Sequence, residues 1–154
     1  MGKVFEDYLA ELQVDMVAIC LEYVEDKAED IFIYCSYEPK VYAFDVFYKI
    51  NGNLVLKHNL NDAIDGTGGS NKYDTSEERQ EAMLDIGLKN LKEINKTCED
   101  FGRQMPTEIK LHYNVSNNSL KASYKYDLIY SNHNDLMSDD IFDDWFEEVN
   151  NSIY

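Results

Sequence analysis

The chain has 154 residues, of which 44% are hydrophobic and 13% aromatic, and this composition excludes a disordered acidic tail and suits one folded domain. Its 30 acidic residues outnumber its 14 lysines and arginines, giving a formal net charge of −16 at pH 7. Such a charge repels nucleic acid and anionic membrane surfaces and attracts basic partners. We therefore expect a soluble protein that binds neither nucleic acid nor membranes.

The first residues predict a helix and not a signal peptide. Apolar side chains recur at helical spacing from Phe5 to Tyr23, as in an amphipathic helix packed on one face. Glu6, Asp7 and Glu11 interrupt the apolar positions, so no secretion signal is expected. No apolar run approaches the roughly 18 residues that a membrane span needs. We expect the protein to be cytoplasmic.

Three strands are predicted next, over residues 31–37, 41–50 and 53–59. The first is aromatic and β-branched and ends before Pro39. Asn51-Gly52 separates the second strand from the third. This pair is the strongest short signal for a hairpin, because both turn positions need positive φ.

The glycine-rich residues 61–74 predict a loop. Its Asp65–Ser70 part invites interpretation as a phosphate-binding loop, but it lacks the Gly-Lys-Ser/Thr ending and no helix follows it directly. A long helix is expected to begin at Thr75, with Glu78 completing a capping box, and to end at Gly102. Its buried stripe is predicted to consist of Met83, Leu84, Leu88, Leu91, Ile94, Cys98 and Phe101.

A second hairpin and a last helix complete the order. Residues 109–115 and 120–126 alternate apolar with polar side chains around a turn at Asn117-Asn118. Residues 139–150 place apolar side chains on one arc and acidic ones on the other. The expected fold is one α+β domain over residues 1–154. It has an antiparallel sheet of about five strands with helices packed on one face, in the order α-βββ-α-ββ-α.

A search for catalytic chemistry identifies no candidate. Cys20, Cys35 and Cys98 lie in apolar stretches without CxxC spacing, which predicts buried free thiols. His58 and His112 are expected on strands and His133 in a polar loop, without the companions of a metal or catalytic motif. We predict no catalytic residue, no cofactor, no metal site and no enzymatic activity.

The charge distribution near the C-terminus is the most informative motif. From Tyr126 to Tyr154 there is no lysine or arginine, and there are eight acidic residues. A solvated helix face usually mixes charge signs to form i,i+4 pairs, whereas clustering of one sign suits recognition of a basic surface. Both interpretations stay open from sequence. The candidate partner-binding residues are Asp135, Asp139, Asp140, Asp143, Asp144, Glu147 and Glu148.

The order of elements resembles the YezG-like bacterial immunity proteins, which are antitoxins of secreted LXG-type toxins. The resemblance spans roughly residues 1–130. It is carried by the aromatic strand from Ile31 to Tyr37, the long helix to Phe101-Gly102, and the Met105-Pro106-Thr107 entry to the next strand. The stretch from Leu120 to Asp127, with its Tyr-Lys-Tyr ending, continues it, and Trp145 matches a late tryptophan of the family.

The resemblance implies a non-catalytic protein that binds and neutralises a cognate toxin, of nuclease type, in the producing cell. An acidic surface suits this role, since a nuclease site is electropositive in order to bind phosphates. Two alternatives stay open: a generic acidic adaptor or secretion chaperone, and an enzyme or metal-binding protein that uses the cluster from Asp135 to Glu148.

Overall fold

The computed structural model describes residues 3–38, 41–63 and 72–153. The phosphate-loop candidate Asp65–Ser70 lies outside these ranges. In chain order the elements are α1 (Phe5–Tyr23), β1 (Asp30–Tyr37), β2 (Tyr42–Ile50), β3 (Asn53–Leu56), a 3-10 helix η1 (Leu60–Ala63), α2 (Glu77–Asp100), β4 (Glu108–Asn114), β5 (Ser119–Lys125) and α3 (Ser138–Ile153). This order confirms the predicted α+β class.

The five strands form one antiparallel sheet in the order β3-β2-β1-β4-β5. The central strand β1 pairs with β2 on one side and β4 on the other. Both predicted hairpins are present. Asn51 and Gly52 have φ of 52° and 79° in the first turn, and Asn118 has φ of 50° in the second. The third strand is shorter than expected, because the chain turns after Leu56, and His58 lies in that turn and not on a strand.

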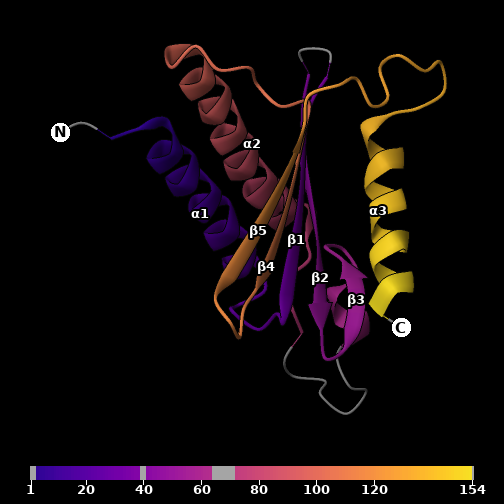
Figure 1. Ribbon diagram of the computed structural model, residues 1–154. Coiled ribbons are helices and arrows are strands. Elements are labelled where there is room, and N and C mark those ends of the chain that lie inside the picture. The colour runs from indigo at the N-terminus through magenta and orange to yellow at the C-terminus, as the bar shows by residue number, and fades with distance from the viewer. Residues whose placement is uncertain (1–2, 39–40, 64–71, 154) are drawn as a thin grey trace.

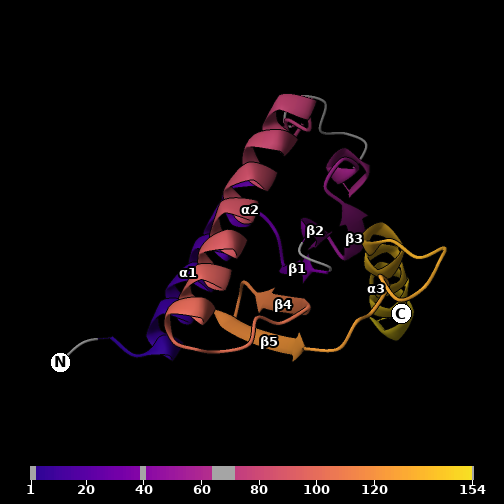
Figure 2. The ribbon, with the colours of Figure 1, turned by 90° about the horizontal axis from the view of Figure 1, so that it is seen from above.

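Helices α1 and α2 cover one face of the sheet, and α3 lies against the other (Figure 1, Figure 2). The expectation that helices pack on one face therefore holds for the two long helices and not for α3. The reason lies in β1, whose residues from Asp30 to Ser36 are buried on both sides of the strand. A strand of this kind needs cover on two faces.

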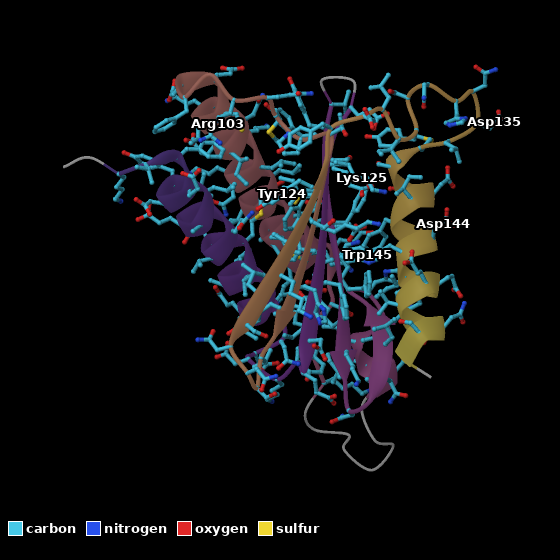
Figure 3. All side chains as sticks on the ribbon, in the orientation of Figure 1. Arg103, Tyr124, Lys125, Asp135, Asp144 and Trp145 are labelled. Atoms are coloured by element: carbon cyan, nitrogen blue, oxygen red, sulfur yellow. The ribbon has the colours of Figure 1, made fainter. Side chains whose placement is uncertain are left out.

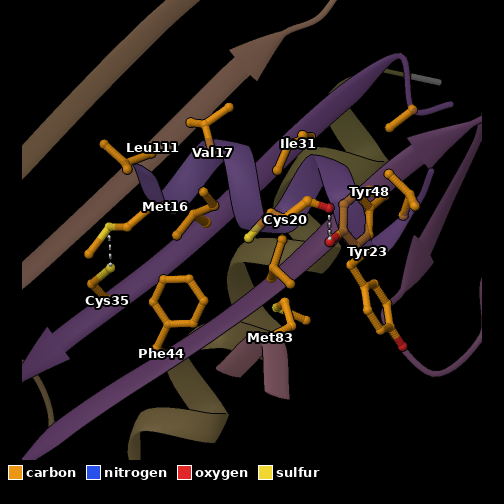
Figure 4. Close-up of a cluster of buried hydrophobic side chains, with 14 of the residues drawn as sticks. Met16, Val17, Cys20, Tyr23, Ile31, Cys35, Phe44, Tyr48, Met83 and Leu111 are labelled. Carbon is orange, nitrogen blue, oxygen red and sulfur yellow. Dashed lines mark hydrogen bonds between the residues drawn. The ribbon is translucent and has the colours of Figure 1, made fainter. Parts of the chain in front are cut away.

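The larger core lies between the sheet and the two long helices (Figure 4). Tyr48 packs against Tyr23 and donates a hydrogen bond from its hydroxyl to the Cys20 carbonyl oxygen at 2.8 Å, so its polar end is satisfied. Cys35 lies beside Met16 in the same cluster. The three cysteines are free and buried, as predicted.

The ends of α2 differ from the prediction at the start and agree with it at the end. Ser76, and not Thr75, is the N-cap, since its hydroxyl accepts a hydrogen bond from the Arg79 backbone N–H at 3.3 Å. Gly102 has φ of 65°, which lets the last turn close with 6→1 and 5→2 hydrogen bonds. Phe101 was expected in the buried stripe, but it is 42% exposed and rests against the rings of Phe5 and Tyr8.

Among the described residues, no helix has both the length and the apolar character that crossing a membrane requires.

Candidate protein-binding surface

Helix α3 is held on the sheet by a cluster of aromatic side chains. Phe142 is 5% exposed, and its ring centroid lies 5.6 Å from that of Phe47 and 6.2 Å from that of Tyr34. Trp145 is partly buried and meets Phe32 and Phe47 edge to face. These contacts fix which side of α3 faces the sheet.

The local sequence of α3 explains why it forms a helix with two chemically different sides. Residues 139–148 repeat a pattern of two acidic and two apolar positions, which places the acidic pairs on one half of the helix and the apolar pairs on the other. Asp139 and Asp140 lie in the first turn, where negative charge is favourable. The Asp140 carboxylate also accepts a hydrogen bond from the Met137 N–H at 2.9 Å.

The seven predicted partner-binding residues are all exposed. Six of them lie on α3, and we call these the acidic face: Asp139, Asp140, Asp143, Asp144, Glu147 and Glu148. Asp135 is separate, because it lies on the loop that precedes the helix (Figure 3). The structure therefore brings six of the seven residues together.

The acidic face has no cationic neighbours that neutralise it within the described part of the chain. All the ion pairs found there join lysines, Arg103 or His112 to acids on other elements. Lys110 comes near α3, but its Nζ lies over the Trp145 ring, 5.3 Å from the centroid. The charges of the acidic face are thus open to a partner.

The pKa of Asp143 reflects its burial and the negative charge that surrounds it. Burial raises its pKa, and the neighbouring carboxylates of Asp139, Asp140, Asp45 and Asp144 raise it further. Each of these groups makes the charged form of Asp143 less favourable. A cation placed on the acidic face would relieve this repulsion.

Two of the three histidines lie where the sequence predicts, and His58 does not. His58 and His133 are exposed, in a turn and a loop respectively. His112 lies on β4 as predicted, and its Nε2 is 2.8 Å from Oδ1 of Asp30. The Asn114 side-chain amide donates to the same oxygen at 3.0 Å, so this contact links β4 to the start of β1. Within the described residues, no group of three or more His, Cys, Asp or Glu side chains is arranged to hold a metal ion.

The thiols have the properties of core residues. Burial raises the pKa of Cys20, Cys35 and Cys98. Each thiol is therefore protonated at neutral pH, and a protonated, buried thiol is a poor nucleophile.

Two buried glutamates were not found by sequence reasoning. Glu38 is 1% exposed, and its Oε1 accepts hydrogen bonds from the N–H groups of Ile129, Tyr130 and Ser131 and from the Ser131 hydroxyl. Glu108 is 2% exposed and lies 3.7 Å from Lys110 Nζ and 3.8 Å from Lys125 Nζ. Glu38 ties the segment before α3 to the end of β1, so it positions the helix from a distance.

A small apolar cavity of about 350 Å³ lies elsewhere, between the start of α1, the end of α2 and β5. Phe5, Leu9, Arg103 and Tyr124 are among the residues that line it. It contains none of the seven candidate residues.

Compared with known proteins, the sequence matches no family model, and no curated protein is significantly similar to it.

Proposed function

We propose that this chain is an immunity protein of the YezG-like kind, which binds a cognate toxin and neutralises it through the acidic face of α3. The observation that carries the proposal is that six exposed acids share one helix face with no ion-pair partner among the described residues. The toxin would present a basic surface, as the active site of a nuclease does.

The arrangement of the acids also favours a role in binding over a role in stability. Asp139, Asp143 and Glu147 follow one another at i,i+4 spacing, and so do Asp140, Asp144 and Glu148. Each such like-charged pair destabilises a helix by about 0.2–0.5 kcal/mol. A helix that carries four of these pairs weakens its own fold, and a basic partner would remove the cost.

The aromatic contacts of Phe142 and Trp145 hold the acidic face in a fixed position on the sheet. Because Phe142 and Trp145 fix α3 against β1 and β2, the acidic face is presented without first having to order a flexible segment. Complementary charge also speeds association, which matters when a toxin must be blocked as it is made. The proposal involves no catalytic step, and the pair formed by His112 and Asp30 serves to join two strands.

Growth rescue tests the function. The product of the adjacent gene would be expressed alone and together with this chain, and we expect the chain to restore growth. A variant with Asp144→Lys, Glu147→Lys and Glu148→Lys should fail to rescue. These positions avoid the capping residue Asp140. The new lysines also form favourable i,i+4 pairs with Asp140 and Asp143, so the helix should persist.

A matched control carries the same change in net charge elsewhere. Asp62→Lys, Glu81→Lys and Glu99→Lys replace exposed acids of η1 and α2 that are in no ion pair among the described residues, and they create no like-charged i,i+4 pair within a helix, so this variant should still rescue. An adaptor would bind the adjacent product without restoring growth. Equal rescue by both triple variants would show that the acidic face is only a solvated surface.

A further inference from the structure

Strand β5 is the open edge of the sheet at the side opposite β3. It pairs with β4 along its seven residues, and no described strand pairs with its other side. Figure 2 shows β5 at the rim of the molecule, away from α3. An edge of this length presents unpaired backbone N–H and C=O groups and can accept another strand.

We propose that the outer edge of β5 pairs with the same edge of a second copy of the chain, forming a two-fold symmetric dimer with a continuous ten-stranded sheet. This inference does not depend on the toxin-binding role. It follows from the charge of β5, from its two faces and from the registers in which it can meet itself.

The charge of β5 differs from that of the whole molecule. The strand contains Lys121 and Lys125 and no acidic residue, whereas the chain carries a net charge of −16. The edge is therefore a place where two copies can approach without opposing carboxylates. Its two faces also differ, since Leu120 and Tyr124 pack toward the core under α1 and α2, and the lysines project from the other face.

Self-pairing is restricted to few registers. A two-fold axis perpendicular to the sheet keeps the same face up in both copies, so a residue can pair only with one that points to its own face. Centring the pair on Lys121 places two lysines opposite each other, and centring it on Ser123 places Lys121 opposite Lys125. Like charges directly opposite are destabilising.

Centring the pair on Ala122 avoids both conflicts and uses all seven residues. Leu120 then lies opposite Tyr124 of the second copy, Lys121 opposite Ser123, and Lys125 opposite Ser119. Apolar side chains meet apolar ones, and each lysine meets a small hydroxyl. This is the register in which β5 is complementary to itself.

The dimer leaves the acidic face of each copy free. Helix α3 packs on residues of β1, β2 and β3, at the far side of the sheet from β5. Two acidic faces would therefore lie at the outer ends of the ten-stranded sheet. Because both copies are negatively charged, added salt should strengthen this dimer, whereas it should weaken binding of a basic partner.

Two substitutions of Ser119 test the register with opposite expected effects. Ser119→Glu places an acid opposite Lys125 of the second copy, and Ser119→Lys places a like charge there. Within its own chain Ser119 pairs with the neutral Asn114, so both variants should keep the monomer fold, as thermal unfolding would show. We expect the first to lower and the second to raise the dimer dissociation constant by about two- to thirtyfold, because each dimer contains two such pairs.

Sedimentation equilibrium would measure the dimer dissociation constants at protein concentrations from about 1 to 500 µM, a range that suits a weak interface. A disulfide adds a geometric test. In Ala122→Cys the new thiols face each other across the axis, within the distance that a disulfide spans, and the native cysteines are buried. In Ser119→Cys the two thiols would be about 20 Å apart and should not join.

A chain that stays monomeric throughout this range, or a dimer that responds equally to both Ser119 variants, would overturn the proposal. So would protection of β5 from hydrogen exchange that appears only with the toxin, because the edge would then accept a strand of that partner. Each of these results leaves the growth-rescue test of the acidic face unaffected.

Discussion

Phe142 and Trp145 both hold α3 on the sheet, and they differ in how deeply they are buried. Phe142 is 5% exposed and touches two aromatic rings, whereas Trp145 is only partly buried. We expect Phe142→Ala to lower the free energy of unfolding by about 3–4 kcal/mol and Trp145→Ala by about 2 kcal/mol. Urea unfolding of both variants would measure this, and a larger loss for Trp145→Ala would contradict the burial seen here.

Glu38 links stability to pH. Burial alone would raise its pKa, but hydrogen bonds from the Ser131 hydroxyl and from the N–H groups of Ser131, Tyr130 and Ile129 outweigh burial and hold the pKa below its usual value. The ionised form therefore stabilises the fold at neutral pH, and this contribution is lost as the pH falls through the lowered pKa.

Glu38→Gln tests this linkage. We expect the variant to be less stable than the wild type by about 1–3 kcal/mol at pH 7, since hydrogen bonds to a charged acceptor become bonds to a neutral one. The difference should shrink at acidic pH, where Glu38 is protonated in both folded and unfolded chains. Unfolding curves at several pH values would show it, and a difference independent of pH would argue against an ionised Glu38.

Gly87 lies in the middle of α2, at the place where the helix crosses the sheet. A Cβ atom at this position would overlap the ring of Phe44, so the glycine lets α2 approach β2 closely. In an exposed helix Gly→Ala stabilises by about 1 kcal/mol, but here overpacking costs about 1–3 kcal/mol and should outweigh that gain. We expect Gly87→Ala to destabilise the protein, and Phe44→Leu to reduce the cost of the change in a double-mutant cycle.

The acidic face makes α3 sensitive to pH in the opposite sense to Glu38. The raised pKa of Asp143 means that the folded chain binds a proton there more strongly than the unfolded chain, so this group costs stability as the pH rises. We expect Asp143→Asn to stabilise the protein at pH 7 by about 0.5–1 kcal/mol, the value of two like-charged i,i+4 pairs. The gain should vanish at low pH, and a gain that persists there would have another cause.

The elements that the sequence predicts well are those with local causes. Asn51-Gly52 determines its hairpin because the turn needs positive φ at both positions, and the pattern from Asp139 to Glu148 determines the two sides of α3 by helical period. The exposure of the six acids follows from that period alone.

The features that were missed depend on residues distant in sequence. Glu38 bonds to groups 91 to 93 positions away, and nothing near it in the chain indicates this. The position of α3 on the second face had one local signal, the apolar run from Ile31 to Cys35 without alternation. Such a run is typical of a strand buried on both faces.

At the scale of the whole molecule, the charges that form ion pairs and the unpaired acids of α3 lie on different parts of the fold. The lysines that are paired neutralise acids on α1, the sheet and its turns, while α3 keeps its six acids free within the described residues. The acidic face lies over β1, β2 and β3, and the open edge of β5 is at the opposite end of the sheet. One surface therefore suits a basic partner, and the other suits a second copy.

The most direct test of the central claim is the rate at which the protein associates with the adjacent gene product as a function of ionic strength. We expect the wild-type rate to fall as salt rises. The variant with Asp144→Lys, Glu147→Lys and Glu148→Lys should bind about tenfold or more slowly at low salt, with a flatter dependence on salt. The control with Asp62→Lys, Glu81→Lys and Glu99→Lys should stay close to wild type. Equal rates and equal salt dependence for all three proteins would contradict a binding role for the acidic face of α3.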